Sequence, residues 1–465
     1  MNRPVHWRTR TAAAAAAVLS LGVLAACSSS SSSSSSSSAP AATSSAPAAT
    51  SAAASSASSS SAGTVSASSC GPTPGVAATG TPINIGAINT KQPGTDFSDI
   101  ENMTGAYFAC VNANGGVNGH PIKFFPVTEA TNPSQIASLA KQLVTTDHVV
   151  GMMGSSSIIE CTVDAAYWKS VGIYVLAAGI APECYSTANT ASVNMGPRYS
   201  SDGAVQYVLA QGANKIAFDQ SNVPGTDYIA AGPNALAKAK GVQIQDFTEN
   251  VPITSANAIA TKLVTAAGPG GAVVLNFTPP EALLILQAAQ KLNLEDRVKY
   301  WACSTPCNTD FLATSLGPKW NNKLFVNAEL LPLDGNTSPT AQLFQAVLKQ
   351  YGSDVSGGVG SFSEMGFTMG EIAVQALKSV QGDYTIASVS AALKGVTNFN
   401  TGMLCQGFTY GNYSTHLPNN MDYTVTPDNG KFVIASTGGG CTLISADDPQ
   451  VAAYRAEAGT APAVG

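Results

Sequence analysis

The sequence predicts an α/β protein of two lobes, each built on a parallel sheet, joined by three crossings of the chain. Strand-like and helix-like segments alternate from residue 83 onward, which is typical of parallel-sheet folds. The alternation restarts after Pro197, so two similar sheets are expected. The folded part, 82–446, is also too long for one hydrophobic core.

The first set of units supplies the first sheet. Asn132 is expected to cap the helix at 133–146, because an Asn side chain accepts hydrogen bonds from the first N–H groups of a helix. Leu139, Leu143 and Val144 share one face of that helix and should point inward. The predicted strands are 83–88, 121–127, 149–153 and 173–177, and the helices are 98–114, 133–146 and 156–171.

The second set follows Pro197 and predicts the second sheet. Three helices then follow one another without a strand between them. Helices need a sheet to cover, so the chain is expected to return to the first lobe and then close on the second. The predicted strands are 215–219, 242–247, 272–277, 298–302, 324–328, 404–410, 421–427 and 431–436, and the helices are 201–211, 225–240, 256–267, 280–292, 340–350, 362–380 and 386–393.

These segments define the expected lobes and the hinge between them. The crossings should lie near Arg198, Leu331 and Gly402, and a hinge of three strands permits closure over a ligand. The expected bounds are 80–198 and 331–402 for the first lobe, 199–330 and 403–446 for the second, and 447–465 for a flexible tail.

The N-terminus has the pattern of an exported protein. Three arginines precede an apolar run at 12–26, which is too short to span a bilayer and is typical of a secretory signal. The run ends in Leu-Ala-Ala-Cys27, which resembles a bacterial lipobox. That resemblance implies a signal peptide at 1–27, cleaved before Cys27, and a lipid on Cys27 that holds the chain at the outer face of the cell membrane. The alternative is an ordinary signal peptide with a chance cysteine.

Amino-acid composition indicates which partners and which cellular compartment the protein is expected to have. Residues 28–79 are almost entirely Ser, Ala, Thr, Pro and Gly, so they predict a disordered tether. The net charge of −6 argues against nucleic-acid binding. Eight cysteines besides Cys27 argue for disulfides in an exported protein. Neighbour pairing is expected: Cys70–Cys110, Cys161–Cys184, Cys303–Cys307 and Cys405–Cys441. A metal site at the third pair is the alternative, but no histidine lies beside it, so neither metal nor cofactor is expected.

Several motifs carry a family resemblance. They are Ile-Asn-Ile-Gly at 83–86, Thr-Gly-Ala at 104–106, Val-Asn-Ala-Asn-Gly-Gly-Val-Asn-Gly-His-Pro-Ile at 111–122, and the strand ends at 154–157 and 178–183. Together, over about 80–445, the chain resembles the leucine/isoleucine/valine-binding family of ABC-transporter solute receptors. The resemblance implies the type I periplasmic-binding-protein fold with two Rossmann-like lobes. It also implies a small-molecule ligand between the lobes, an ABC permease as partner, and a monomer.

The candidate ligand site lies beyond the carboxyl ends of the strands, where open parallel sheets bind ligands. Ser155 and Ser156 lie where a strand gives way to a helix, and free N–H groups there would suit a carboxylate. Simple N-capping is the alternative. The resemblance places the family's carboxylate-binding serine at Ser155. The full set of expected contacts is Phe97, Ser155, Ser156, Ala178, Gly179, Ile180, Pro224, Phe277, Thr278 and Ser304.

The sequence does not identify the residue that would bind the polar end of the ligand. The acid that receives an ammonium in this family would fall at Ser304 or Thr305, and neither is acidic. Asp227, Glu281 and Asp310 are the candidate substitutes, although surface exposure is the ordinary state of such residues. An amino acid, an amide or another carboxylate would each fit. Four aromatic residues are candidates either to stack on a ring or to pack in the core: Phe97, Tyr185, Phe277 and Trp301.

The expected function is solute binding rather than catalysis. The sequence has no G-x-S-x-G elbow and no P-loop. Only His120, His148 and His416 lie outside the signal, which disfavours a Ser–His triad. We therefore expect a solute-binding lipoprotein of an ABC transporter. The alternatives are a ligand-sensing domain for a membrane signalling partner and, less favoured, an enzyme on this scaffold.

Overall fold

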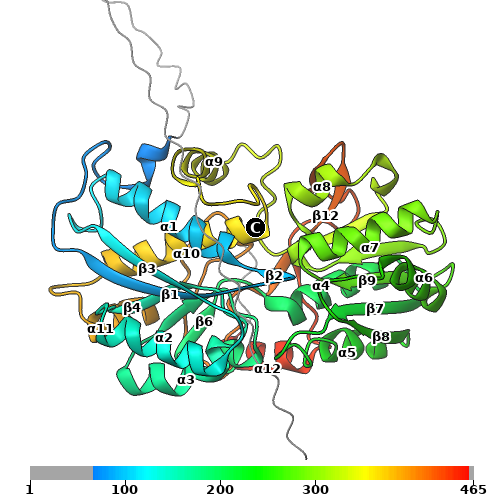
Figure 1. Cartoon of the computed structure of the whole chain (residues 1–465), viewed down its shortest axis with the longest axis horizontal. Helices are drawn as coiled ribbons and strands as arrows, with labels where there is room; N and C mark the ends of the chain where they lie inside the picture. Colours follow the sequence, from blue (N-terminus) through cyan, green and yellow to red (C-terminus); the bar gives the residue numbers. More distant parts are fainter. Residues whose placement is uncertain (1–65, 460–465) are drawn as a thin grey trace, which may run out of the picture. The chain divides into compact units, whose positions relative to one another are not determined.

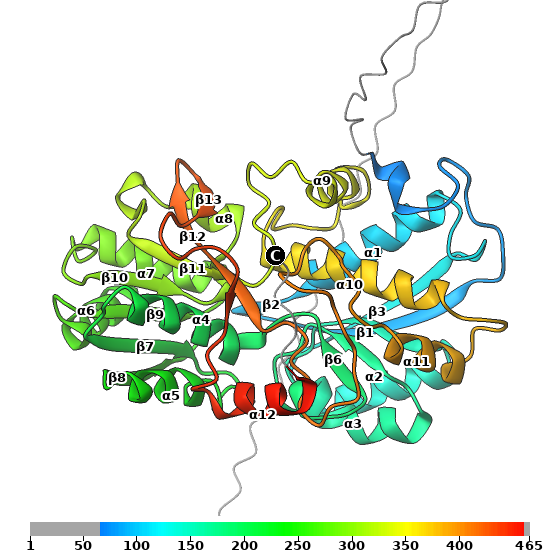
Figure 2. The same cartoon turned by 180° about the vertical axis from the view of Figure 1, so that it is seen from behind.

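The computed structural model describes residues 66–459. The expected signal peptide, its lipidation site Cys27 and the first part of the expected tether lie outside the described residues. The described chain forms two sheets, each with helices on both faces (Figure 1, Figure 2). Within residues 66–459, no helix has the length and apolar character needed to cross a bilayer.

The first sheet has six strands, in the order β2-β1-β4-β5-β6 with β3 beside β1. All pairings are parallel except that of the short β2. Two helices, α2 (Pro133–Thr145) and α3 (Glu160–Val171), cover one face, and α1 (Ser98–Ala113) lies on the other. The strands are β1 (Ile83–Gln92), β2 (Thr95–Asp96), β3 (Ile122–Glu129), β4 (Gly151–Ser155), β5 (Val175–Ala177) and β6 (Thr190–Ser192).

Three late helices complete this first lobe. They are α9 (Pro339–Tyr351), α10 (Ser361–Lys378) and α11 (Ile386–Lys394), and they share one apolar core with α1. Figure 1 shows α10 and α11, in yellow and orange, in the same lobe as the blue and cyan β1 and α1. Gly366 permits the close approach of α10 to α1, because a Cβ there would lie 2.1 Å from the backbone oxygen of Ile100.

The second sheet has the order β13-β12-β11-β10-β9-β7-β8, with β14 beside β12. Strands β7 to β11 run parallel, β12 pairs antiparallel with β11, and β13 pairs antiparallel with β12. The strands are β7 (Lys215–Ser221), β8 (Gln243–Glu249), β9 (Ala272–Asn276), β10 (Tyr300–Cys303), β11 (Leu324–Ala328), β12 (Met421–Asp428), β13 (Lys431–Ile434) and β14 (Thr442–Leu443). Helices α6 (Ala256–Ala267), α7 (Pro279–Lys291) and α8 (Asp310–Ser315) share one core, and α4 (Gly196–Ala210) and α5 (Ala231–Ala239) share the other.

The three crossings between the lobes meet at Asn419. Its side-chain Nδ2 donates to the backbone oxygens of Val193 (3.3 Å) and Glu329 (2.9 Å), which lie on the other two crossings. The third crossing therefore lies near Asn419 and not near Gly402. The predicted strand at 404–410 is also wrong. Its apolar residues, including Phe408 and Tyr410, fill the core of the first lobe, and its backbone forms a single bridge to Phe399.

The described parts of both ends that were expected to be unstructured, 66–79 and 447–459, are ordered. Residues 66–79 pack on α1, because Cys70 is bonded to Cys110 and the backbone N–H of Ala78 donates to Asn112. The tail contains α12 (Pro449–Ala458), which the buried ion pair of Arg198 with Asp448 holds in place. The structure forms four disulfides, in the neighbour pairs expected from the sequence: Cys70–Cys110, Cys161–Cys184, Cys303–Cys307 and Cys405–Cys441.

Candidate functional site

A cavity of about 700 Å³, counting its opening to solvent, lies between the two lobes. Its walls come from the carboxyl ends of strands in both sheets, which is where ligands bind in open α/β sheets. Most of the lining side chains are apolar: Phe97, Ile100, Ile158, Ala178, Ile180, Pro197, Val223, Ile229, Phe277, Pro306, Phe362 and Met365. The cavity therefore suits a ligand with an apolar body.

Five of the residues predicted to contact ligand line this cavity. Ala178 and Ile180 follow β5, and Phe277 and Thr278 follow β9, so they reach it from opposite lobes. Phe97 precedes α1 and packs edge-to-face on Phe362, with ring centroids 5.3 Å apart. The two rings form part of the first-lobe wall.

The other five do not line the cavity. Ser155 and Ser156 are fully buried, and the Ser155 hydroxyl accepts a hydrogen bond from the backbone of Ile88 (3.2 Å). Gly179 lies behind the wall, where a Cβ would come 2.2 Å from the hydroxyl of Ser192. Ser304 donates to Asn276 in the second lobe, and Pro224 is exposed.

The N-terminus of α3, where we expected free N–H groups, is closed by the chain itself. Helix α3 begins at Glu160 rather than 156, because the hydroxyl of Ser157 accepts from the backbone N–H groups of Ile159 (3.3 Å) and Glu160 (3.1 Å). The N–H of Ile158 donates to Thr90 (2.8 Å). Burial raises the pKa of Glu160 to about 8, and Asp164 adds to the rise. These contacts leave little room for a ligand carboxylate.

Of the candidate aromatic and acidic residues, some line the cavity and others do not. Phe97 and Phe277 line the cavity, whereas Trp301 packs on Trp320 in a core and the Tyr185 hydroxyl donates to Gly179 (2.6 Å). None of the three candidate acids lines it. Asp227 is exposed, Glu281 accepts from the backbone of Ile253 (2.7 Å) outside the cavity, and Asp310 lies at the start of α8.

One acidic residue of the cavity was not predicted. Glu329 follows β11 and is 1% exposed. Its Oε2 accepts from the backbone N–H of Met195 (2.6 Å), whereas Oε1 has no hydrogen-bond partner among the described residues. Burial raises the pKa of Glu329 to about 8; the bond from Met195 opposes the rise and the carboxyl of Asp422 adds to it. An acid directly after an apolar strand was the sequence signal for this position.

Contacts between the lobes surround the cavity. The hydroxyl of Tyr228, from the second lobe, donates to the backbone oxygen of Ile180 in the first. Thr278 of the second lobe likewise donates to Gly94 of the first (3.2 Å). Since these bonds join residues of the cavity wall to the opposite lobe, they favour the arrangement in which the lobes lie close together.

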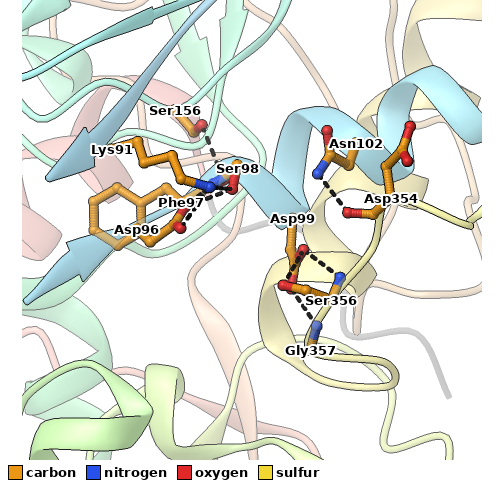
Figure 3. A network of polar contacts seen from close by, with 10 residues as sticks. All are labelled: Lys91, Asp96, Phe97, Ser98, Asp99, Asn102, Ser156, Asp354, Ser356 and Gly357. Atoms are coloured by element: carbon orange, nitrogen blue, oxygen red, sulfur yellow. Dashed lines mark hydrogen bonds and ion pairs between the residues drawn. The ribbon is translucent and has the colours of Figure 1, made fainter. Parts of the chain in front are cut away.

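A second, more open groove adjoins the cavity and shares Thr95, Thr278 and Phe362 with it. One of its walls is the loop before α10, which is held on α1 by Asp99 (Figure 3). The carboxylate of Asp99 accepts from the backbone N–H groups of Ser356 (2.8 Å) and Gly357 (2.6 Å). The groove is also lined by the exposed Asp96 and the buried Glu281. Its described lining residues include acids but neither lysine nor arginine.

The sequence matches a protein-family model described as periplasmic binding protein over residues 82–430. The chain therefore belongs to the periplasmic binding protein family, as the resemblance implied. No curated protein matches it in sequence. Within the described residues, no group of three or more His, Cys, Asp or Glu side chains is arranged to hold a metal ion.

Solved structures show the same fold at low sequence identity. A branched-chain amino acid ABC transporter protein from Thermus thermophilus with bound valine is 16% identical, with a TM-score of 0.69 over 80% of this chain and 98% of that one. A fatty acid ABC transporter substrate-binding protein from Thermomonospora curvata is 15% identical (TM-score 0.64, 82% and 97% covered). A solute binding protein from Rhodopseudomonas palustris HaA2 in complex with p-hydroxybenzoic acid is also 15% identical (TM-score 0.64, 79% and 98% covered).

Proposed function

We propose that this chain is an extracytoplasmic solute-binding lipoprotein of an ABC transporter. It would be anchored through Cys27 to the outer face of the cell membrane and would present a small solute to a permease as a monomer. The observation that carries the proposal is the cavity between the lobes, because both lobes contribute its walls at their strand ends. Ligand in the cavity would contact both lobes at once and so favour the closed arrangement.

Binding without chemical conversion fits this site. Proteins of known structure with this fold are named for transport and carry valine or p-hydroxybenzoic acid. A ligand-sensing role for a membrane signalling partner would use the same cavity and the same closure. Transport and sensing differ in the membrane partner that binds the closed state.

The proposal is tested by a thermal-shift screen of the mature chain over amino acids, amides, amines and carboxylic acids. A solute that binds only the native state should raise the melting temperature by roughly 5 °C at a hundredfold excess over its Kd. Ala178→Leu places a larger side chain in the cavity and should abolish the rise. The matched control Ala258→Leu, on the exposed side of α6, should keep it. A rise that persists in Ala178→Leu would contradict binding in this cavity.

A further inference from the structure

The cavity is apolar over most of its wall, and its described lining residues include one ionisable side chain, which is an acid. Among the described residues that line it, Glu329 is the only ionisable side chain, and none is lysine, arginine or histidine. Arg198 follows Pro197 of the lining, but its guanidinium donates two hydrogen bonds to Asp448 (2.7 and 2.8 Å). No basic group of the wall is therefore available to receive a carboxylate.

The acidic character extends behind Glu329. Thr305 of the wall donates to Asn327 (2.5 Å), and Asn327 donates in turn to the buried carboxyl of Asp422. The open groove at the cavity is lined by Asp96, Asp99 and Glu281, of which Asp96 forms an ion pair with Lys91 (2.9 Å).

The usual place for an anion in such a sheet is also closed. The backbone N–H groups at the start of α3 are bonded to Ser157 and Thr90, and Glu160 occupies its first turn. Glu329, by contrast, keeps one carboxylate oxygen without a partner while its side chain is almost fully buried. A buried polar atom of this kind normally has a partner, so the ligand is the group that would supply it.

Resting on the proposed solute-binding function, we propose that the ligand is an apolar amine without a carboxylate, and that Oε1 of Glu329 accepts a hydrogen bond from its ammonium group. The apolar wall around Phe97, Phe277 and Met365 takes the body of the amine. Glu329 is then the residue that determines specificity. It follows β11, the strand beside β10, and the family resemblance placed an acid directly after β10.

Two matched series of probes test the inference by isothermal titration calorimetry on the mature chain. The first is isoamylamine, leucine and isocaproate; the second is phenethylamine, phenylalanine and hydrocinnamate. Each series keeps the apolar body and changes the amine and the carboxylate separately. The amines should bind at least about tenfold more tightly than the corresponding acids and amino acids, because the wall offers no partner for a carboxylate.

Glu329→Gln should weaken amine binding by at least about tenfold, since the amide retains an acceptor for Met195 but has no charge. Asp227→Asn, an exposed control, should leave it unchanged. Tighter binding of an acid or an amino acid than of the amine would reject the inference and leave solute binding intact, as would an unchanged amine affinity in Glu329→Gln. Absence of binding by every probe would count against the inference and against the proposed function together.

Discussion

The guanidinium of Arg198 and the carboxylate of Asp448 form a buried ion pair with two hydrogen bonds, 2.7 and 2.8 Å long, across a sequence separation of 250 residues. The pair joins the start of α4 to the N-cap of α12, where Asp448 also accepts from the backbone of Gln450. Figure 2 shows α12, in red, at the side of the molecule where the two lobes approach each other.

Asp448→Asn should therefore destabilise the protein by about 3–5 kcal/mol, because it leaves the buried Arg198 without its counter-charge. The measurement is a denaturant melt followed by circular dichroism. Asp447→Asn changes the exposed neighbouring residue and should shift stability by less than about 0.5 kcal/mol. Equal effects of the two substitutions would show that the pair contributes nothing specific.

Asn419→Ala should lower stability by about 1–3 kcal/mol, because it leaves the buried backbone oxygens of Val193 and Glu329 without their donor. It should also alter ligand affinity, since Glu329 supplies both a hinge carbonyl and a cavity carboxyl. Thermal melting and calorimetry measure the two effects. Asn257→Ala, on the exposed surface of α6, is the control and should change neither quantity appreciably.

Stability should fall as pH rises from about 5 to 8. Burial raises the pKa of Glu101, Glu160 and Glu329 to about 8, whereas these groups ionise near their ordinary values in the unfolded chain. The folded state therefore binds more protons in this window, and each group contributes a slope of about −1.4 kcal/mol per pH unit. Glu160→Gln should make the fall shallower by about one such slope. Asp383→Asn, at an exposed position, should leave it as steep as in the wild type.

Amine affinity should rise with pH below about 8 and level off above it. The ammonium binds the ionised form of Glu329, and that form increases about tenfold per pH unit below the pKa of about 8. Three groups interact electrostatically with Glu329: Tyr185, Glu364 and Asp422. Burial raises the pKa of each well above its ordinary value. Calorimetry of isoamylamine between pH 6 and 9 checks this, and a flat profile in the wild type would contradict it.

The alternation of segments predicted the five parallel strands β7 to β11 within a few residues, because β7, β9, β10 and β11 contain short apolar runs; β8 has only two apolar residues, Ile244 and Phe247. It failed at 404–410, where an equally apolar run fills a core without pairing in a sheet. Periodicity reports burial, and burial alone does not separate a strand from an apolar coil segment.

The site was harder to predict than the fold because its chemistry depends on distant partners. Local sequence placed Ser155 at the end of a strand correctly, but the N–H groups beyond it are bonded to Thr90 and Ser157. Thr90 lies 68 residues before Ile158, its bonding partner. Glu329 likewise meets Met195 over a separation of 134 residues. A local sequence pattern cannot predict hydrogen bonds between residues so far apart in the chain.

The late position of β12 and β13 in the sequence limits how the protein can be divided into separate lobes. Their residues, 421–434, complete the sheet that begins at β7, while α9 to α11 belong with the sheet that begins at β1. Neither half is encoded by one uninterrupted stretch. A single cut thus cannot release either half intact, and exchange of one half with a relative requires three coordinated breakpoints, each close to the contacts of Asn419.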